Sequence, residues 1–229
     1  MNASSNDRSL VVAMAAYVAM LAVLPLLLEA PTVERLFSEE GPFERLAIVG
    51  WIFAAGIVGW RTRHLGYPAA SFAALFLFFA AREAEWHRAF TADSILKTNY
   101  YRHAAAPIAE KLVAGLVTLV IFGLLIHVAW RIVRFLLLDS GWRSRAGAWL
   151  LGSGLLMVAT KVLDRLFNIL ANDFGIVVSP NARLISSAVE EGVEMLLPLV
   201  TTRAFWIAAS ERTFLTRSDA GTDTDRPAR

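Results

Sequence analysis

The chain has 229 residues, of which 56% are hydrophobic and 18% charged, with a formal net charge of +2 and a mean hydropathy of +0.52. Because it has no cysteine, it can form no disulfide, thiolate metal site, iron–sulfur cluster or cysteine nucleophile. Its basic residues flank apolar runs and form no basic stripe, so we expect no nucleic-acid partner.

The apolar residues come in six blocks, each close to the roughly 20 residues that a helix needs to cross a bilayer. Unbroken apolar runs favour helices over the alternating pattern of barrel strands. We therefore predict an all-α polytopic membrane protein, a bundle of six transmembrane helices within residues 1–210, followed by a polar, disordered cytoplasmic tail, 211–229. The predicted spans are 10–28, 43–60, 69–89, 107–135, 148–170 and 184–209.

The first block is predicted to remain in the protein as a span. Its polar start carries a single basic residue, Arg8, and no A-x-A cleavage site follows, so a signal peptide is disfavoured. Arginine clusters in WRTRH, WRIVR and WRSR border the second, fourth and fifth spans on one side. By the positive-inside rule, they predict that both termini are cytoplasmic.

Charged residues interrupt the third, fifth and sixth blocks at one depth. At about 1.5 Å per residue, Glu83, Asp164 and Glu190 each lie roughly 9 Å below the outer boundary, and Glu194 lies one turn deeper. A carboxylate within hydrocarbon costs roughly 2.5 to 3.5 kcal/mol, so several at one depth predict a shared polar pocket that opens outward.

Further charged residues are expected beside this layer. Glu110 and Lys111 begin the fourth span on the same side, and Glu40 and Glu44 precede the second span, where they are predicted to form a rim. Four of the six predicted spans would then contribute to one acidic layer, with the second at its edge.

Helical spacing indicates which charged residues can act together. Glu83 and His87 are four residues apart and share a helix face, as do Glu190 and Glu194. Glu85 lies about 200° around the helix from Glu83, so it faces another way unless the helix unwinds.

Carboxylates with one histidine are ligands that suit Zn, Mn or Fe. We accordingly predict a divalent metal site in a membrane enzyme that acts on a lipid or other membrane-embedded substrate. A bound metal ion would activate water or oxygen there. The residues predicted both as metal ligands and as catalytic groups are Glu83, His87, Asp164, Glu190 and Glu194.

Two alternatives use the same residues. Buried acids and a histidine are equally suited to a proton- or cation-coupled transport path. Alternatively, Arg82, Lys161 and Arg165 neutralise the acids as structural ion pairs, as expected of a structural or assembly subunit.

The loop 90–106 is longer than the others and predicts a short interfacial helix that ends at Lys97. His103 and its neighbouring tyrosines are predicted either to close over the pocket or to form an interfacial cluster. His127 is predicted to pack near the inner face.

The segments EEGPFER, REAEWHRAFTADSILKTNYY, KVLDRL and VEEGVEML, in that order, resemble an uncharacterised family of bacterial polytopic inner-membrane proteins with EGxxE, RExDxH and EExxE segments. The resemblance covers residues 39–194 and departs at Glu85, where the family usually has Asp. It implies a bacterial membrane protein and brings no activity with it.

Overall fold

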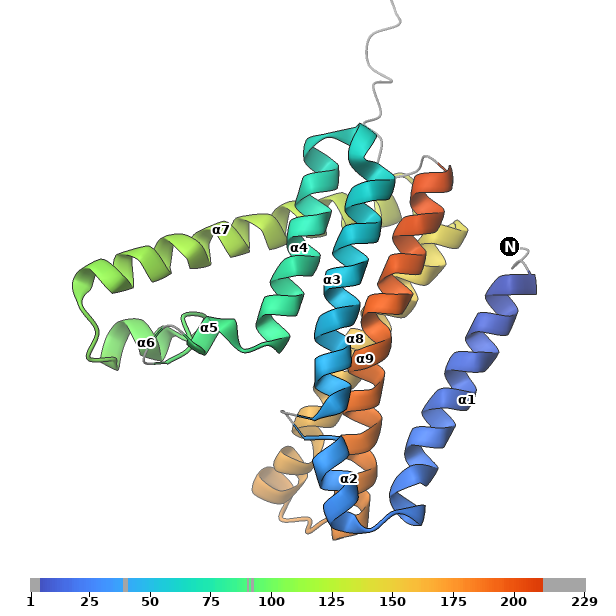
Figure 1. Ribbon diagram of the computed structural model, residues 1–229, viewed down its shortest axis with the longest axis vertical. Helices are drawn as coiled ribbons and strands as arrows, with labels where there is room; N and C mark the ends of the chain where they lie inside the picture. The colour runs from blue at the N-terminus through green and yellow to red at the C-terminus, as the bar shows by residue number, and fades with distance from the viewer. Residues whose placement is uncertain (1–4, 39–40, 90, 92, 212–229) are drawn as a thin grey trace, which may run out of the picture.

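The computed structural model describes residues 5–38, 41–89, 91 and 93–211, and over these residues the chain is helical with no strand (Figure 1). The all-α prediction is confirmed. Glu40 and the predicted tail beyond residue 211 lie outside the described residues. The helices are α1 Ser5–Leu27, α2 Ala30–Leu36, α3 Pro42–Thr62, η1 Arg63–Leu65, α4 Tyr67–Glu83, α5 Trp86–Ala89, α6 Thr98–His103, α7 Ile108–Val133, η2 Arg134–Leu138, η3 Gly141–Arg143, α8 Arg145–Phe174 and α9 Pro180–Glu211.

Within the described chain, five stretches of helix are long and apolar enough to cross a membrane, which supports a multi-pass membrane protein. They correspond to five of the six predicted spans and are Ser5–Leu27, Pro42–Thr62, Ile108–Leu138, Arg145–Phe167 and Pro180–Ser210. The remaining predicted span, 69–89, corresponds to α4. The 17 residues of α4 give a helix about 26 Å long, which is shorter than the hydrocarbon core of a bilayer, about 30 Å thick. Six is therefore an approximate count.

The third predicted span, 69–89, is not one continuous helix. Helix α4 ends at Glu83, the chain turns through Ala84 and Glu85, and the short helix α5 begins at Trp86. Glu85 has φ 53°, a left-handed conformation that cannot continue the right-handed ladder of hydrogen bonds. The prediction of an unbroken helix to residue 89 is wrong for this reason.

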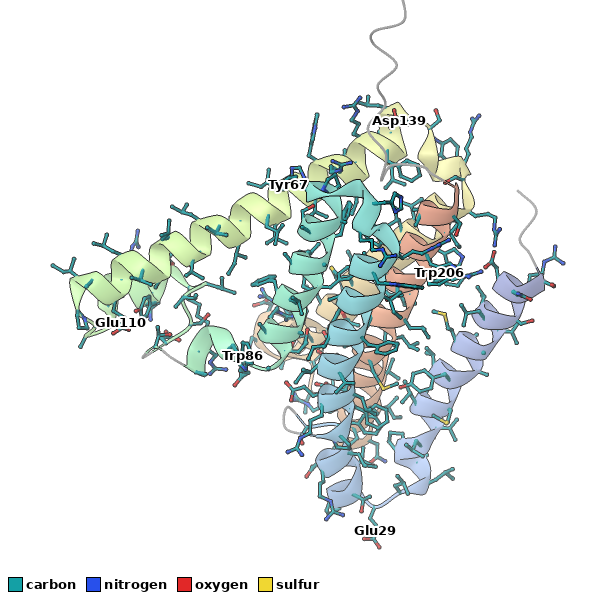
Figure 2. The ribbon with its side chains drawn as sticks, turned by 45° about the horizontal axis from the view of Figure 1, so that its top comes forward. Glu29, Tyr67, Trp86, Glu110, Asp139 and Trp206 are labelled. Carbon is teal, nitrogen blue, oxygen red and sulfur yellow. The ribbon has the colours of Figure 1, made fainter. Side chains whose placement is uncertain are left out.

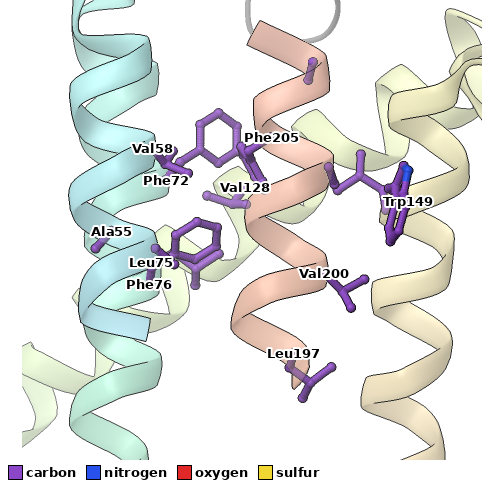
Figure 3. Packing of buried hydrophobic residues seen from close by; sticks show 14 of the residues in the cluster. Ala55, Val58, Phe72, Leu75, Phe76, Val128, Trp149, Leu197, Val200 and Phe205 are labelled. Atoms are coloured by element: carbon purple, nitrogen blue, oxygen red, sulfur yellow. The ribbon is translucent and has the colours of Figure 1, made fainter. Parts of the chain in front are cut away.

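Helix α9 is the central element, with α3 and α4 on one side and α8 on the other (Figure 3). In its span 61% of the residues are buried, compared with 6% in α1. Aromatic side chains join the layers: the Phe205 ring lies 4.6 Å from that of Phe72 and 5.2 Å from that of Phe76. Against α8, the buried hydroxyls of Ser153 and Thr201 are 2.6 Å apart.

Helix α1 packs along α9 through a second, smaller cluster that includes Leu21, Val33 and Phe37. The Leu21 side chain is fully buried, and Tyr17 donates a hydrogen bond of 3.2 Å to the carbonyl of Gly192. Gly192 permits this approach because a Cβ there would lie 2.7 Å from Leu21 Cδ2.

Helix α7 does not join the bundle along its length. It contacts α4 near its C-terminal end, where the rings of His127 and Tyr67 are 5.3 Å apart, and its N-terminal end extends away beside α5 and α6 (Figures 1 and 2). Its side chains are apolar on most faces, and Leu112, Leu116 and Val120 are exposed. Lipid solvates such a helix as well as another helix would, so composition alone does not draw it into the bundle.

Candidate functional site

The predicted acidic layer forms where α4, α8 and α9 approach one another. Lys161 of α8 is its centre, since its Nζ lies 3.1 Å from Glu194 Oε1 on α9 and 3.9 Å from Asp164 Oδ2 one turn along α8. The Glu194 side chain is 15% exposed, whereas Lys161 and Asp164 are about half exposed, at 45% and 49%. One cation is thus shared between carboxylates of two helices.

Glu83 reaches the same layer from the last residue of α4. Its Oε1 accepts a hydrogen bond of 2.8 Å from Arg82 Nη1, its side chain is 15% exposed, and it interacts electrostatically with Glu194 and Lys161. Glu83 is thus at the end of α4 that lies nearest to Lys161 and Glu194. The predicted meeting of the third, fifth and sixth spans is therefore present in the fold.

Two further residues of α9 complete the acidic layer. Glu190 interacts electrostatically with Asp164 and with Glu194. Glu191 interacts with Glu83, Glu190, Glu194 and with Glu44 at the start of α3. The predicted pair on one helix face is Glu190 and Glu194, and Glu191, three residues from Glu194, shares a face with Glu194 as well.

The pairing of His87 with Glu83 on one helix face does not hold, because the turn at Glu85 separates α4 from α5. The side chain of His87 itself lies outside the described residues, so its predicted role as a ligand stays a prediction. Among the described side chains, no three His, Asp or Glu residues come together in the way that a metal ion requires. The described carboxylates repel one another, and Lys161 pairs with two of them, Asp164 and Glu194.

The fourth span does not contribute to this layer. Glu110 lies at the outlying end of α7, where its Oε1 accepts a hydrogen bond of 2.7 Å from Tyr100 (Figure 2). This hydrogen bond raises the pKa of the Tyr100 hydroxyl to about 12. The prediction that Glu110 and Lys111 share the acidic layer is wrong, because α7 leaves the bundle.

The loop before α7 also differs from its prediction. The described residues between 91 and 97 form turns, in which Thr91 donates to the carbonyl of Asp93, and the helix begins at Thr98, after Lys97. Tyr101 donates to the carbonyl of Ile95 and lies 2.9 Å from the hydroxyl of Thr118 on α7. The tyrosines therefore pack against α7 instead of closing over the acidic layer.

A buried ion-pair cluster that the sequence did not reveal lies at the opposite end of the bundle. Asp7 of α1 is 5% exposed and contacts two arginines, with Arg145 Nη2 at 2.7 Å from its Oδ2 and Arg203 Nη2 at 2.7 Å from its Oδ1. Arg145 Nε donates a second hydrogen bond, of 3.0 Å, to Asp7 Oδ2. One feature of the sequence could have indicated this cluster. Asp7 is an acidic residue in the first turn of α1, and that end of the bundle is rich in arginine.

Comparisons of the chain with protein-family models, with characterised proteins and with solved structures find no match. A proposed function therefore rests on the geometry of the chain's own residues.

Proposed function

We propose that the acidic layer is the functional site of a bacterial inner-membrane protein, and that it binds a divalent cation in an enzyme acting on a lipid or membrane-embedded substrate. The observation that supports this is an imbalance of charge. Two cations, Arg82 and Lys161, make ion pairs within the layer. The carboxylates that interact there include Glu83, Asp164, Glu190, Glu191 and Glu194.

Carboxylates that are partly removed from water at membrane depth are costly unless they are neutralised. A divalent cation neutralises two of them at once, and carboxylate and imidazole groups are suitable ligands for Zn, Mn or Fe. Glu83, Asp164, Glu190 and Glu194 are the proposed oxygen ligands, and His87 is the proposed nitrogen ligand. Such an ion would supply a Lewis acid or an activated water. With the termini in the cytoplasm, the layer opens outward.

Elemental analysis of the purified protein tests this proposal. We expect about one divalent ion per chain and its loss in Glu194→Gln and His87→Ala. The matched control is Asp139→Asn, which removes a carboxylate at the other end of the bundle, exposed beside η3 (Figure 2). A metal content near zero in the parent protein, or one that falls equally in the control, would rule the metal out.

The position of Lys161 favours a second candidate, an ion-coupled transporter. A single ammonium group between Glu194 and Asp164 can pass from one to the other when either is protonated, as a coupling site requires. Proteoliposomes should then show a proton or cation flux that Glu190→Gln and Asp164→Asn abolish and Asp139→Asn preserves. If neither metal nor flux is found, and the variants only lower stability, the layer is a structural ion-pair network.

A further inference from the structure

A groove of about 820 Å³ runs between α1 and α8, separate from the acidic layer. Its walls are apolar side chains of both helices, among them Val11, Val12, Trp149 and Leu155, and Val200 of α9 contributes to its floor. Asp7, Arg8 and Arg145 line its other part, so the groove has an apolar body and a charged end. Its volume is typical of sites that hold organic ligands.

The length of the apolar body matches one leaflet of a membrane. On α8 the apolar lining extends from Ala148 to Ala159, eleven steps along the helix, or about 16 Å. Half of the hydrocarbon thickness of a bilayer is about 15 Å. Because Arg145 opens α8, the charged end of the groove lies where the headgroups of that leaflet would lie.

The charge of this end is positive after the ion pairs are counted. Of the charged residues that line it, Asp7 contributes one negative charge and Arg8 and Arg145 contribute two positive charges, so their sum is +1, and Arg203 of α9 adds a further cation beside Asp7. An anionic ligand is therefore favoured there, and basic residues near a membrane surface attract anionic lipid by roughly 1 kcal/mol each.

We infer that the groove binds one anionic glycerophospholipid, with an acyl chain along α1 and α8 and its phosphate beside Arg8 and Arg145. Such a lipid combines an apolar chain of one leaflet's length with a negative headgroup at its end. Its binding would fill the space beside α1, a helix with few buried residues of its own.

A pair of glycines in α8 provides a matched test. Gly152 lines the groove and Gly154 does not, and a Cβ at either position would meet nothing within 4 Å. Both Gly152→Leu and Gly154→Leu should therefore fold, and both gain helix propensity. After reconstitution with equal phosphatidylglycerol and phosphatidylcholine, native mass spectrometry should find retained phosphatidylglycerol on the parent protein and on Gly154→Leu. Gly152→Leu should lose it.

The headgroup is tested with Arg8→Gln. The ion pairs described for Asp7 are with Arg145 and Arg203, so this change leaves both in place. Removing one charge should reduce the preference for phosphatidylglycerol over phosphatidylcholine about fivefold. Inorganic phosphate should not compete, because the acyl chain provides much of the contact. Equal retention of both lipids, or loss in both glycine variants, would overturn the inference. So would a dimer of this chain that Gly152→Leu dissociates.

Discussion

Asp7 and Arg203 are separated by 196 residues in the sequence, and a hydrogen bond of 2.7 Å joins Arg203 Nη2 to Asp7 Oδ1. Arg145 approaches the other carboxylate oxygen, so one aspartate ties α1 to both α8 and α9. Since few residues of α1 are buried, this ion-pair cluster near its start, the Tyr17–Gly192 hydrogen bond at its middle and the buried Leu21 hold it against the bundle.

Asp7→Asn should destabilise the protein, because two arginines then face each other without the carboxylate. Removing one partner of a fully buried pair costs roughly 3 to 5 kcal/mol, and we expect about 2 kcal/mol here because the arginines keep some contact with solvent. Denaturant unfolding in detergent measures the loss. Glu29→Gln, an exposed acid at the far end of α1, serves as control (Figure 2). Equal stability of the two variants would contradict the prediction.

The packing of α1 on α9 predicts that one destabilising substitution partly compensates for another. Gly192→Ala places a methyl group against the fully buried Leu21 and should cost about 1 to 3 kcal/mol. Leu21→Ala alone should cost about 2 kcal/mol or more through the cavity that it leaves. The double variant should lose less than the sum of the two, because the new methyl group occupies vacated space. Additive losses in thermal unfolding would show that the two residues are not in contact.

The left-handed turn between α4 and α5 predicts a stabilising substitution. Glu85 has φ 53°, and this left-handed conformation costs a residue other than glycine roughly 1 to 2 kcal/mol of conformational energy. The exposed ion pair between Glu85 and Arg88 offsets little of that cost. Glu85→Gly should therefore raise the free energy of unfolding by about 0.5 to 1 kcal/mol. Glu34→Gly, inside α2, should lower it by a similar amount. If both variants lowered the free energy of unfolding, the left-handed backbone conformation at residue 85 would be contradicted.

The contact between Tyr100 and Glu110 predicts an alkaline transition. The hydrogen bond to Glu110 raises the pKa of Tyr100 to about 12, above the ordinary value of about 10. Because the folded chain holds this proton more tightly, the associated stability is fully present below pH 10 and is lost between pH 10 and pH 12.

Ultraviolet titration of tyrosinate should detect this step. We expect it to disappear in Tyr100→Phe and to move to lower pH in Glu110→Gln. It should persist in Tyr67→Phe, which removes an exposed tyrosine. A step near pH 12 that survives Tyr100→Phe would assign it to another residue.

Much of the acidic layer could be predicted from sequence because depth in a membrane follows from counting residues along a helix. Glu83, Asp164 and Glu194 are predicted at similar depths. Carboxylates within hydrocarbon are costly, so several at one depth are expected to share a polar space. The role of Glu110 could not be predicted in this way, since depth says nothing about lateral position. Helix α7 lies beside the bundle at one end only, and lipid solvates the remainder equally well.

The sequence by itself determined the all-helical fold, the membrane-spanning lengths and the separation of acids from arginine clusters, because these depend on composition and on the rise of a helix per residue. Tertiary structure alone decided that α9 is central, that Glu191 lies near Glu83 and Glu44, and that Asp7 joins Arg145 and Arg203. Those relationships depend on how helices rotate and approach one another, and side chains far apart in the chain set that arrangement together.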